Sequence, residues 1–217
     1  YNSFIEPAAK FISEYIEATT GLPQASFDLW EEKYGTSTYT AASVYGGLMA
    51  ATRFAGLLGK DNDARTYQAI AQRLSTAIVT HLYKPELKMF VKQVFHTDDG
   101  LVYDDTLDVS SFHGIVLFDV LPVDDERVKA SLKTIEAKLV VNAESHGFVR
   151  YERDTYYTMQ EAGSPNPWVI TTLWVAQYYI AAATKAADLK TALGILEWTA
   201  SHAGAGGTLA EQMHPHT

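Results

Sequence analysis

Helical segments of two kinds alternate along this chain. Segments of the first kind carry apolar residues on one face only, at about residues 4–15, 67–81, 128–139 and 189–200. Segments of the second kind are apolar or small nearly all round, at about residues 40–58, 107–120 and 167–183. One-sided helices border on solvent, whereas helices that are apolar on every side are buried. The alternation therefore predicts an all-α fold with an outer and an inner ring of helices, an (α/α)6 barrel.

The links between these segments fall into two classes. Links from a buried to a one-sided segment are short, at about residues 58–63, 121–124 and 184–186. Links from a one-sided to a buried segment are long, at about residues 19–39, 84–106 and 141–166 and after residue 204, and hold most of the acidic and aromatic loop residues. All links of one class emerge at the same end of an up-and-down array, so we expect that end to carry the function. About seven helices are predicted. This is fewer than a closed six-hairpin barrel needs, because each hairpin consists of two helices. We expect residues 1–217 to be one partial barrel domain of a longer parent chain, lacking helices at both ends.

Composition limits the partners of such a domain. The chain has 217 residues, of which 47% are hydrophobic, and this fits one globular core. Its net charge of −9 argues against nucleic acid or an anionic membrane as a partner, because both bind basic surfaces. The apolar run 168–183 is shorter than the ~20 residues that span a bilayer. The absence of cysteine slightly favours a reducing, cytoplasmic compartment without excluding secretion, so localisation stays open.

The pentapeptide Asp28-Leu29-Trp30-Glu31-Glu32 lies in the first long link and sets two adjacent carboxylates beside an indole. Glycosidic bonds are usually cut by a pair of carboxyl groups, and aromatic rings form platforms on which sugars lie. Adjacent side chains diverge, so only one of the two glutamates can face the scissile oxygen. A partly dry pocket beside Trp30 would favour the protonated form of that carboxyl group. A solvated acidic loop is the alternative, but it gives no reason for the tryptophan.

This stretch resembles the catalytic-acid segment of glycoside hydrolase family 15, which contains glucoamylases, glucodextranases and trehalases. The resemblance implies that Glu31 is the general acid. It also implies that Asp28 and Glu32 bind sugar hydroxyls and that Trp30 contacts the substrate.

A second segment, residues 150–157 followed by 166–168, resembles the arginine-tyrosine segment of the same family. The resemblance implies that Arg150 binds hydroxyls of the sugar at the non-reducing end, a role for which a planar guanidinium with five donors is well suited. Trp168 would form a wall of the sugar pocket, and Asp154 would orient Arg150 or meet a hydroxyl itself. Two alternatives stay open: Asp154 pairs with Arg153, or Trp168 belongs to the core.

A third segment, Leu209-Ala210-Glu211-Gln212, resembles the family's Ala-Glu-Gln segment, which carries the general base. Glu211 would then deprotonate the attacking water. Inverting glycosidases hold their two carboxyl groups roughly 6.5 to 9.5 Å apart, a gap that loops at one barrel end can provide. His214 and His216 offer a metal site as an alternative, but no carboxylate cluster accompanies them. We expect no metal and no cofactor.

The three motifs stand in the family's order and together imply an inverting exo-acting glycoside hydrolase. Its substrate would be an α-glucan or small α-glucoside, from whose non-reducing end it releases glucose. The alternative in another class is a non-catalytic α/α-barrel module that binds glucan or regulates a partner, although the carboxylate pair argues against it. Among enzymes, a trehalase or a glucodextranase is the alternative.

Two departures from the family pattern bear on the pocket. Ser37 stands where many bacterial members have histidine, and the arginine-aspartate segment that family members carry upstream is absent from this chain. We therefore expect the rest of the parent polypeptide to complete both the pocket and the barrel.

Overall fold

The computed structural model describes residues 1–141, 146–158 and 165–215, and within them it contains seven α-helices, a short 3-10 helix and six short strands. The helices are α1 (Ile5–Glu14), α2 (Thr38–Leu57), α3 (Asp61–Leu82), α4 (Val109–Leu117), α5 (Glu126–Lys138), α6 (Val169–Ala182), the 3-10 helix η2 (Ala186–Leu189) and α7 (Lys190–Ser201). The strands are β1 (Ser26–Phe27), β2 (Tyr34–Ser37), β3 (Tyr83–Lys84), β4 (Met89–Phe90), β5 (Gln93–Thr97) and β6 (Gly100–Asp104).

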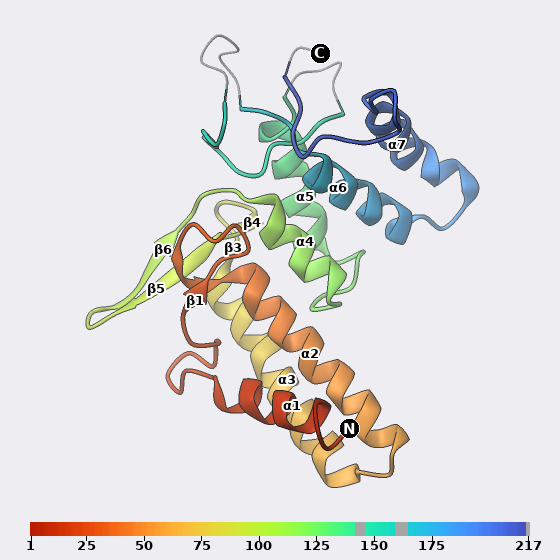
Figure 1. Cartoon of the computed structure of the whole chain (residues 1–217). Helices are drawn as coiled ribbons and strands as arrows, with labels where there is room; N and C mark the ends of the chain where they lie inside the picture. The colour runs from red at the N-terminus through yellow and green to blue at the C-terminus, as the bar shows by residue number, and fades with distance from the viewer. Residues whose placement is uncertain (142–145, 159–164, 216–217) are drawn as a thin grey trace.

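Three helical hairpins form two layers. Helix α2 packs against α3, α4 against α5, and α6 against α7. The first helix of each hairpin also contacts the first helix of the next, so α2, α4 and α6 make up the inner layer. Figure 1 shows the hairpins following one another in a curved array, from α1, α2 and α3 near the N-terminus to α6 and α7 near the C-terminus. The all-α prediction is confirmed for the main elements, which form an incomplete α/α barrel.

The apolar patterns explain the two layers. Helix α2 buries residues on more than one face, most of them small, such as Ala41, Ala42 and Ala51, so other helices can approach it from several sides. Helix α3 instead buries one stripe, which includes Tyr67, Leu74 and Ile78, and its opposite face is exposed. The assignment of buried segments to the inner layer and one-sided segments to the outer layer is thus confirmed.

Gly46 sets how closely α2 approaches the end of α4. A Cβ atom added at Gly46 would lie 2.5 Å from Cδ1 and 3.0 Å from Cβ of Phe118. We expect Gly46→Ala to lower the free energy of unfolding by about 1–3 kcal/mol, because the Phe118 ring must move. In the same helix, a Cβ at Gly56 would meet nothing within 4 Å. Gly56→Ala is therefore expected to raise the free energy of unfolding by about 0.5–1 kcal/mol. Urea denaturation measures both changes, and equal changes would contradict this close approach.

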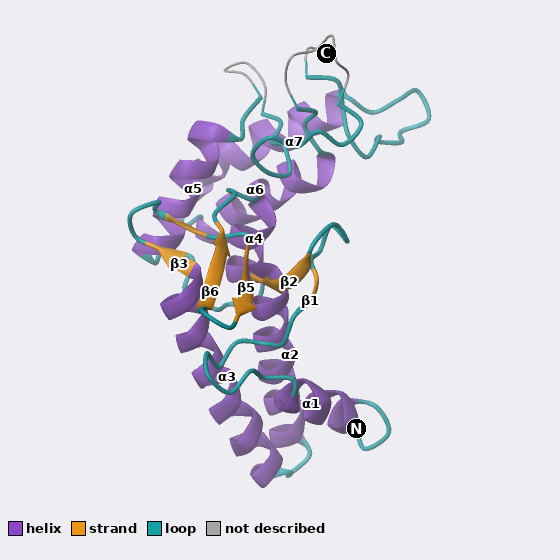
Figure 2. Ribbon diagram, turned by 90° about the vertical axis from the view of Figure 1, so that its left-hand side faces the viewer, coloured by secondary structure: helices purple, strands orange, loops and turns teal. Residues whose placement is uncertain are grey.

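The first two long links carry strands, which the sequence patterns did not predict. Strands β1, β2, β5 and β6 form one antiparallel sheet in that order, and β3 pairs with β4. Figure 2 shows these strands lying together on one side of the helical array. The β5–β6 hairpin turns at Asp98-Asp99, and Gly100, the first residue of β6, has a φ of 118°. Consecutive aspartates followed by a glycine are typical turn residues, so this part of the sheet could have been recognised.

The inner helices leave part of their apolar surface uncovered. Leu57 on α2 is 83% exposed, and Leu117 on α4 and Ile180 on α6 are about half exposed. Inner helices of a closed barrel are buried all round, so this surface is of the kind that further helices would cover. No helix in the described part of the chain is both long and apolar enough to cross a membrane.

Candidate active site

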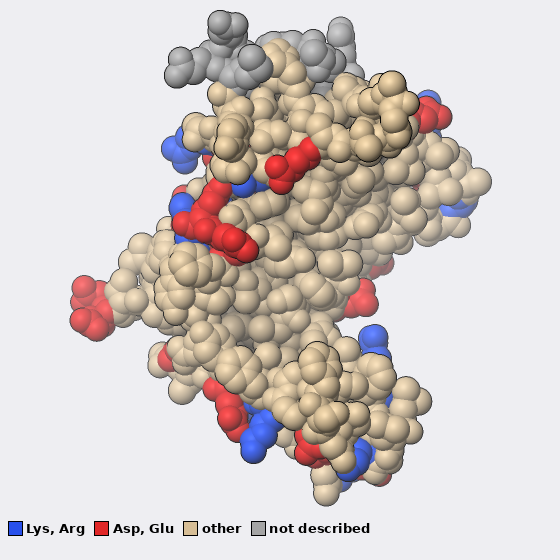
Figure 3. Space-filling model, in the orientation of Figure 1, with Lys and Arg blue, Asp and Glu red and all other residues tan. Residues whose placement is uncertain are grey.

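A cleft of about 600 Å³ lies where three of the long links meet. Its lining consists of Leu29, Trp30, Glu31, Glu32, Arg150, Tyr156, Trp168, Ile170, Trp174 and Glu211. These residues come from the β1–β2 loop, from the segment after α5, from the start of α6 and from the segment after α7. Figure 3 shows acidic side chains gathered on the face where the β1–β2 loop approaches the C-terminal segment. The cleft thus combines carboxylates, one cation and several aromatic rings.

The β1–β2 loop holds the first carboxylates in a fixed turn. Phe27 pairs with Tyr34 across the two strands, and the N–H of Asp28 donates to the carbonyl of Lys33 at 2.9 Å. The Oδ1 atom of Asp28 accepts the N–H of Glu32 at 2.9 Å. Glu31 is exposed and has a φ of 58°, a left-handed conformation that is uncommon for a residue with a side chain. Backbone strain of this kind persists only where the surrounding contacts hold it.

Arg150 lies at the centre of the cleft wall, and two carboxylates bind its guanidinium. Its Nε and Nη2 atoms donate to Asp154 at 2.7 and 2.8 Å, and Nη2 lies 3.0 Å from Oε1 of Glu32. Burial opposes the charge of Arg150, but the hydrogen bonds and charge of Asp154 offset burial and raise its pKa. The nearest ring is that of Trp168, whose centroid lies 4.4 Å from the guanidinium carbon. The cation is therefore fixed in position and stays charged.

Glu32 and Tyr151 extend this network. The hydroxyl of Tyr151 donates to Oε2 of Glu32 at 2.6 Å, so Glu32 faces Arg150 and Tyr151. Burial raises the pKa of Tyr151, and so does the hydrogen bond to Glu32. The side chain of Glu32 is 30% exposed but engaged by Arg150 and Tyr151, whereas Glu31, at the same cleft, has no side-chain hydrogen bond or ion pair with the described residues.

Backbone pairing positions the segment that carries Glu211. Trp168 pairs with Gln212 in an isolated bridge, and the carbonyl of Glu211 accepts the N–H of Val169 at 3.1 Å. The side chain of Asn166 donates to Oε1 of Gln212 at 2.7 Å. These contacts hold Glu211 beside the N-terminus of α6.

A buried charge cluster lies under the β1–β2 loop. The ammonium of Lys92 lies 3.6 Å from Oδ2 of Asp28 and 3.3 Å from Oδ2 of Asp108, and all three side chains are at most 3% exposed. The same Oδ2 atom of Asp108 accepts the indole N–H of Trp30 at 2.9 Å, while Oδ1 accepts the N–H of Ser110 as the N-cap of α4. Burial raises the pKa of Asp108, and Lys92 together with these donors counteracts it.

Aromatic rings continue from the cleft into the core. Trp30 lies 6.2 Å from Trp168 and 5.9 Å from Trp174, between ring centroids. Trp174 stacks on His113 at 4.3 Å with an interplanar angle of 5°. Burial lowers the pKa of His113 to about 4, so the ring is uncharged at neutral pH. The part of the cleft floor around Trp174 is therefore made of packed, uncharged rings.

The structure brings most of the predicted site residues together. Trp30, Glu31, Glu32, Arg150, Trp168 and Glu211 line the cleft. Asp28 and Asp154 are not part of the lining. They lie behind it, 5% and 2% exposed, where Asp28 accepts the N–H of Glu32 and Asp154 pairs with Arg150. Of the predicted alternatives, the pairing partner of Asp154 is Arg150 and not Arg153.

Sequence reasoning missed several residues at or below the cleft. Trp174 belongs to the buried core but also lines the cleft, and it stands four positions after Ile170, which places both on one helix face. The sequence around Lys92 and Asp108 could also have pointed to these two residues. Lys92 follows the apolar run Met89–Val91, and Asp108 directly precedes a buried helix, a usual position for an N-cap.

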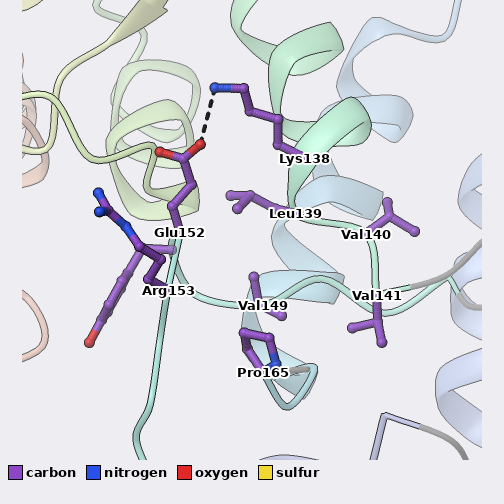
Figure 4. A pocket seen from close by; sticks show the side chains of 9 residues that line it. Lys138, Leu139, Val140, Val141, Val149, Glu152, Arg153 and Pro165 are labelled. Carbon is purple, nitrogen blue, oxygen red and sulfur yellow. Dashed lines mark hydrogen bonds and ion pairs between the residues drawn. The ribbon is translucent and has the colours of Figure 1, made fainter. Parts of the chain in front are cut away.

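A second cavity of about 490 Å³ adjoins the far side of the segment that holds Arg150. Figure 4 shows its lining, which includes Leu139, Val140, Val141, Val149 and Pro165 beside an ion pair of Lys138 with Glu152 at 3.1 Å. It holds neither Glu31 nor Glu211. Within residues 1–141, 146–158 and 165–215, no group of three or more His, Cys, Asp or Glu side chains could bind a metal ion, and His216 lies outside these residues.

Comparison with known proteins places this geometry in a family. The family model described as glycosyl hydrolases family 15 matches residues 2–215. An uncharacterized glycosyl hydrolase of Methanocaldococcus jannaschii is 30% identical over 179 residues, which cover 82% of this chain and 26% of that protein. This chain thus spans about a quarter of the length of that relative.

Solved structures show the same fold. A bacterial glucoamylase complexed with acarbose aligns over 100% of this chain and 34% of its own, with a TM-score of 0.79 and 20% identity. The glycoside hydrolase family 15 glucoamylase from Hypocrea jecorina aligns over 91% of this chain and 41% of its own, with a TM-score of 0.64 and 18% identity. At these identities the likeness concerns the fold alone, which is that of a glucoamylase barrel.

Proposed function

Since the chain belongs to glycosyl hydrolase family 15, we propose that it carries the catalytic carboxylates of an inverting, exo-acting hydrolase that releases glucose from the non-reducing end of an α-glucan. The observation that carries this proposal is one cleft lined by both Glu31 and Glu211, two residues far apart in the chain. Two carboxyl groups across a sugar-sized cleft are the requirement for hydrolysis of a glycosidic bond.

The two glutamates take complementary roles in a single displacement. Glu31 gives its proton to the glycosidic oxygen as the bond from that oxygen to the anomeric carbon breaks. Glu211 takes a proton from water, whose oxygen bonds to the anomeric carbon from the opposite face, so the configuration inverts. Proton exchange with solvent then restores both groups. No cofactor takes part in these steps.

The remaining lining supports binding of a sugar. We assign Arg150 to hydroxyls of the terminal glucose, because a guanidinium held by Asp154 and Glu32 keeps its orientation without help from the ligand. Trp30 and Trp168 both have their rings next to this cation, with centroids 5.1 and 4.4 Å from the guanidinium carbon. Asp28 and Asp154 contribute from behind the lining, by holding the β1–β2 loop and Arg150.

The cleft is open on one side, and this openness is relevant to which form of the protein is active. Glu31 is exposed, and the inner helices leave apolar residues such as Leu57 uncovered. We propose that the rest of a longer parent polypeptide covers these surfaces, completes the sugar pocket and dries the surroundings of Glu31. The activity is accordingly assigned to that complete polypeptide.

The test is release of glucose by the complete polypeptide that carries this chain, with the anomer followed by polarimetry. The substrates are maltotriose, isomaltose and trehalose, and the Glu211→Gln variant gives the background. We expect β-glucose to appear first from maltotriose. First release from isomaltose would indicate a glucodextranase, and from trehalose a trehalase. A folded protein that binds maltotriose but hydrolyses none of the three would favour the non-catalytic glucan-binding module.

A further inference from the structure

Lys92 has an unusual environment for a lysine, and nothing in the proposed reaction uses it. Its side chain is 3% exposed and projects from the start of the chain segment that leads into β5. One ammonium here faces two carboxylates, Asp28 and Asp108, and its Nζ atom lies 3.7 Å from the ring centroid of Tyr151. A buried charge is costly unless it is paired, so this arrangement needs a reason beyond packing.

Each partner of Lys92 holds a different part of the β1–β2 loop. Asp28 belongs to the loop, and its Oδ1 atom accepts the N–H of Glu32, directly after Glu31. Asp108 belongs to the N-terminus of α4 and accepts the indole N–H of Trp30, directly before Glu31. Lys92 is therefore the one cation in contact with both anchors within the described residues.

The Oδ2 atom of Asp28 depends on Lys92 in particular. That atom is buried and has no hydrogen-bond donor among the described residues, so the ammonium at 3.6 Å is the charge that faces it. Without the ammonium, two buried carboxylates would be left without their counter-ion, and repulsion would push the loop away from α4. Glu31, whose φ of 58° lies in the left-handed region, belongs to the part of the loop that would move, and its strained conformation would then no longer be held.

We propose that Lys92 is a positioning residue for the general acid: its buried ammonium ties the β1–β2 loop to α4 and so keeps Glu31 aimed at the glycosidic oxygen. This inference rests on the proposed function. It predicts a loss that falls on proton donation, because Lys92 does not line the cleft, its ion pairs are to Asp28 and Asp108, and Arg150 keeps its own pair with Asp154.

The test compares two substrates of the complete polypeptide. Maltotriose needs a proton from the general acid at its leaving oxygen, whereas the fluoride of α-D-glucosyl fluoride departs with little help. For Lys92→Met, which keeps the length of the side chain but removes the charge, we expect kcat on maltotriose to fall about 100-fold, as for a small misplacement of a reacting group. On the fluoride we expect a fall of less than about 10-fold, because general acid catalysis is hardly used there. Lys129→Met, which removes an ammonium from an exposed ion pair, is the matched control.

Each outcome of the two-substrate comparison either supports or overturns the positioning role of Lys92. Equal losses on both substrates, or no loss on either, overturn the inference while leaving the proposed function intact. If the unaltered protein releases glucose from neither substrate, the proposed function itself is wrong and the inference falls with it. Should Lys92→Met fail to fold, Asp28→Asn replaces it, because the amide keeps the oxygen that accepts the N–H of Glu32 but loses the charge that faces Lys92. The same selective loss is then expected, whereas equal losses would mean that Asp28 acts on the sugar.

Discussion

Glu31→Gln is expected to lower kcat on maltotriose by about a thousandfold, the usual size of a general acid's contribution. Glutamine has nearly the shape of glutamate but holds no transferable proton, so binding of maltotriose should change little. Because Glu31 is exposed, the free energy of unfolding should also stay the same. Steady-state kinetics on maltotriose, with binding followed by calorimetry, measure these effects.

Two further variants make this result specific. Glu211→Gln is expected to cost about as much on maltotriose and also on α-D-glucosyl fluoride, because water must be activated for either substrate. Glu31→Gln should spare the fluoride. Glu126→Gln, which alters a carboxylate that is 88% exposed on α5, serves as the surface control. Equal behaviour of Glu31→Gln and Glu126→Gln would remove Glu31 from the mechanism.

Arg150→Met is expected to have the largest effect on stability, lowering the free energy of unfolding by about 3–5 kcal/mol. The arginine side chain is 4% exposed and that of Asp154 is 2% exposed, so the substitution leaves a buried carboxylate without its partner. It also removes the cation that we assign to the sugar hydroxyls, and KM should rise. Urea denaturation and kinetics on maltotriose give the two values.

The control for Arg150 is another arginine that is paired with an aspartate. Arg127 pairs with Asp125 at 2.7 Å, but its side chain is 35% exposed. Arg127→Met is therefore expected to cost at most about 1 kcal/mol. Adding Asp154→Asn to Arg150→Met removes the unpaired charge and should restore part of the lost stability. If Arg150→Met is no less stable than Arg127→Met, the buried pair is not what holds this wall of the cleft.

Much of the fold could be predicted because helical burial leaves a local signature. Whether a helix lies in the inner or the outer layer depends on how many of its faces are apolar, and this is readable within each segment, as in α2 and α3. The strands in the long links were missed because they are two to five residues long, too short for a periodic pattern to emerge. Only the turn residues Asp98, Asp99 and Gly100 signalled them.

The residues of the candidate site were predicted less completely than the fold. Motif resemblance pointed to Glu31, Arg150 and Glu211, which line one cleft. It could not distinguish residues that line the cleft from residues that support it, since Asp28 stands within the same pentapeptide as Glu31 and yet lies behind the lining. Such a difference is one of side-chain direction in a loop, which spacing along the chain does not specify.

The sequence by itself determined the two helical layers, the end at which the long links gather, and the residue types of the cleft, because apolar periodicity and short motifs are local properties. Only the tertiary structure decided that Glu32, and not Glu31, pairs with Arg150, and that Lys92 and Asp108 lie beneath Trp30. Trp30 and Asp108 are 78 positions apart. Their contact depends on how the sheet and the inner helices pack together, and this is settled by many weak interactions over the whole fold.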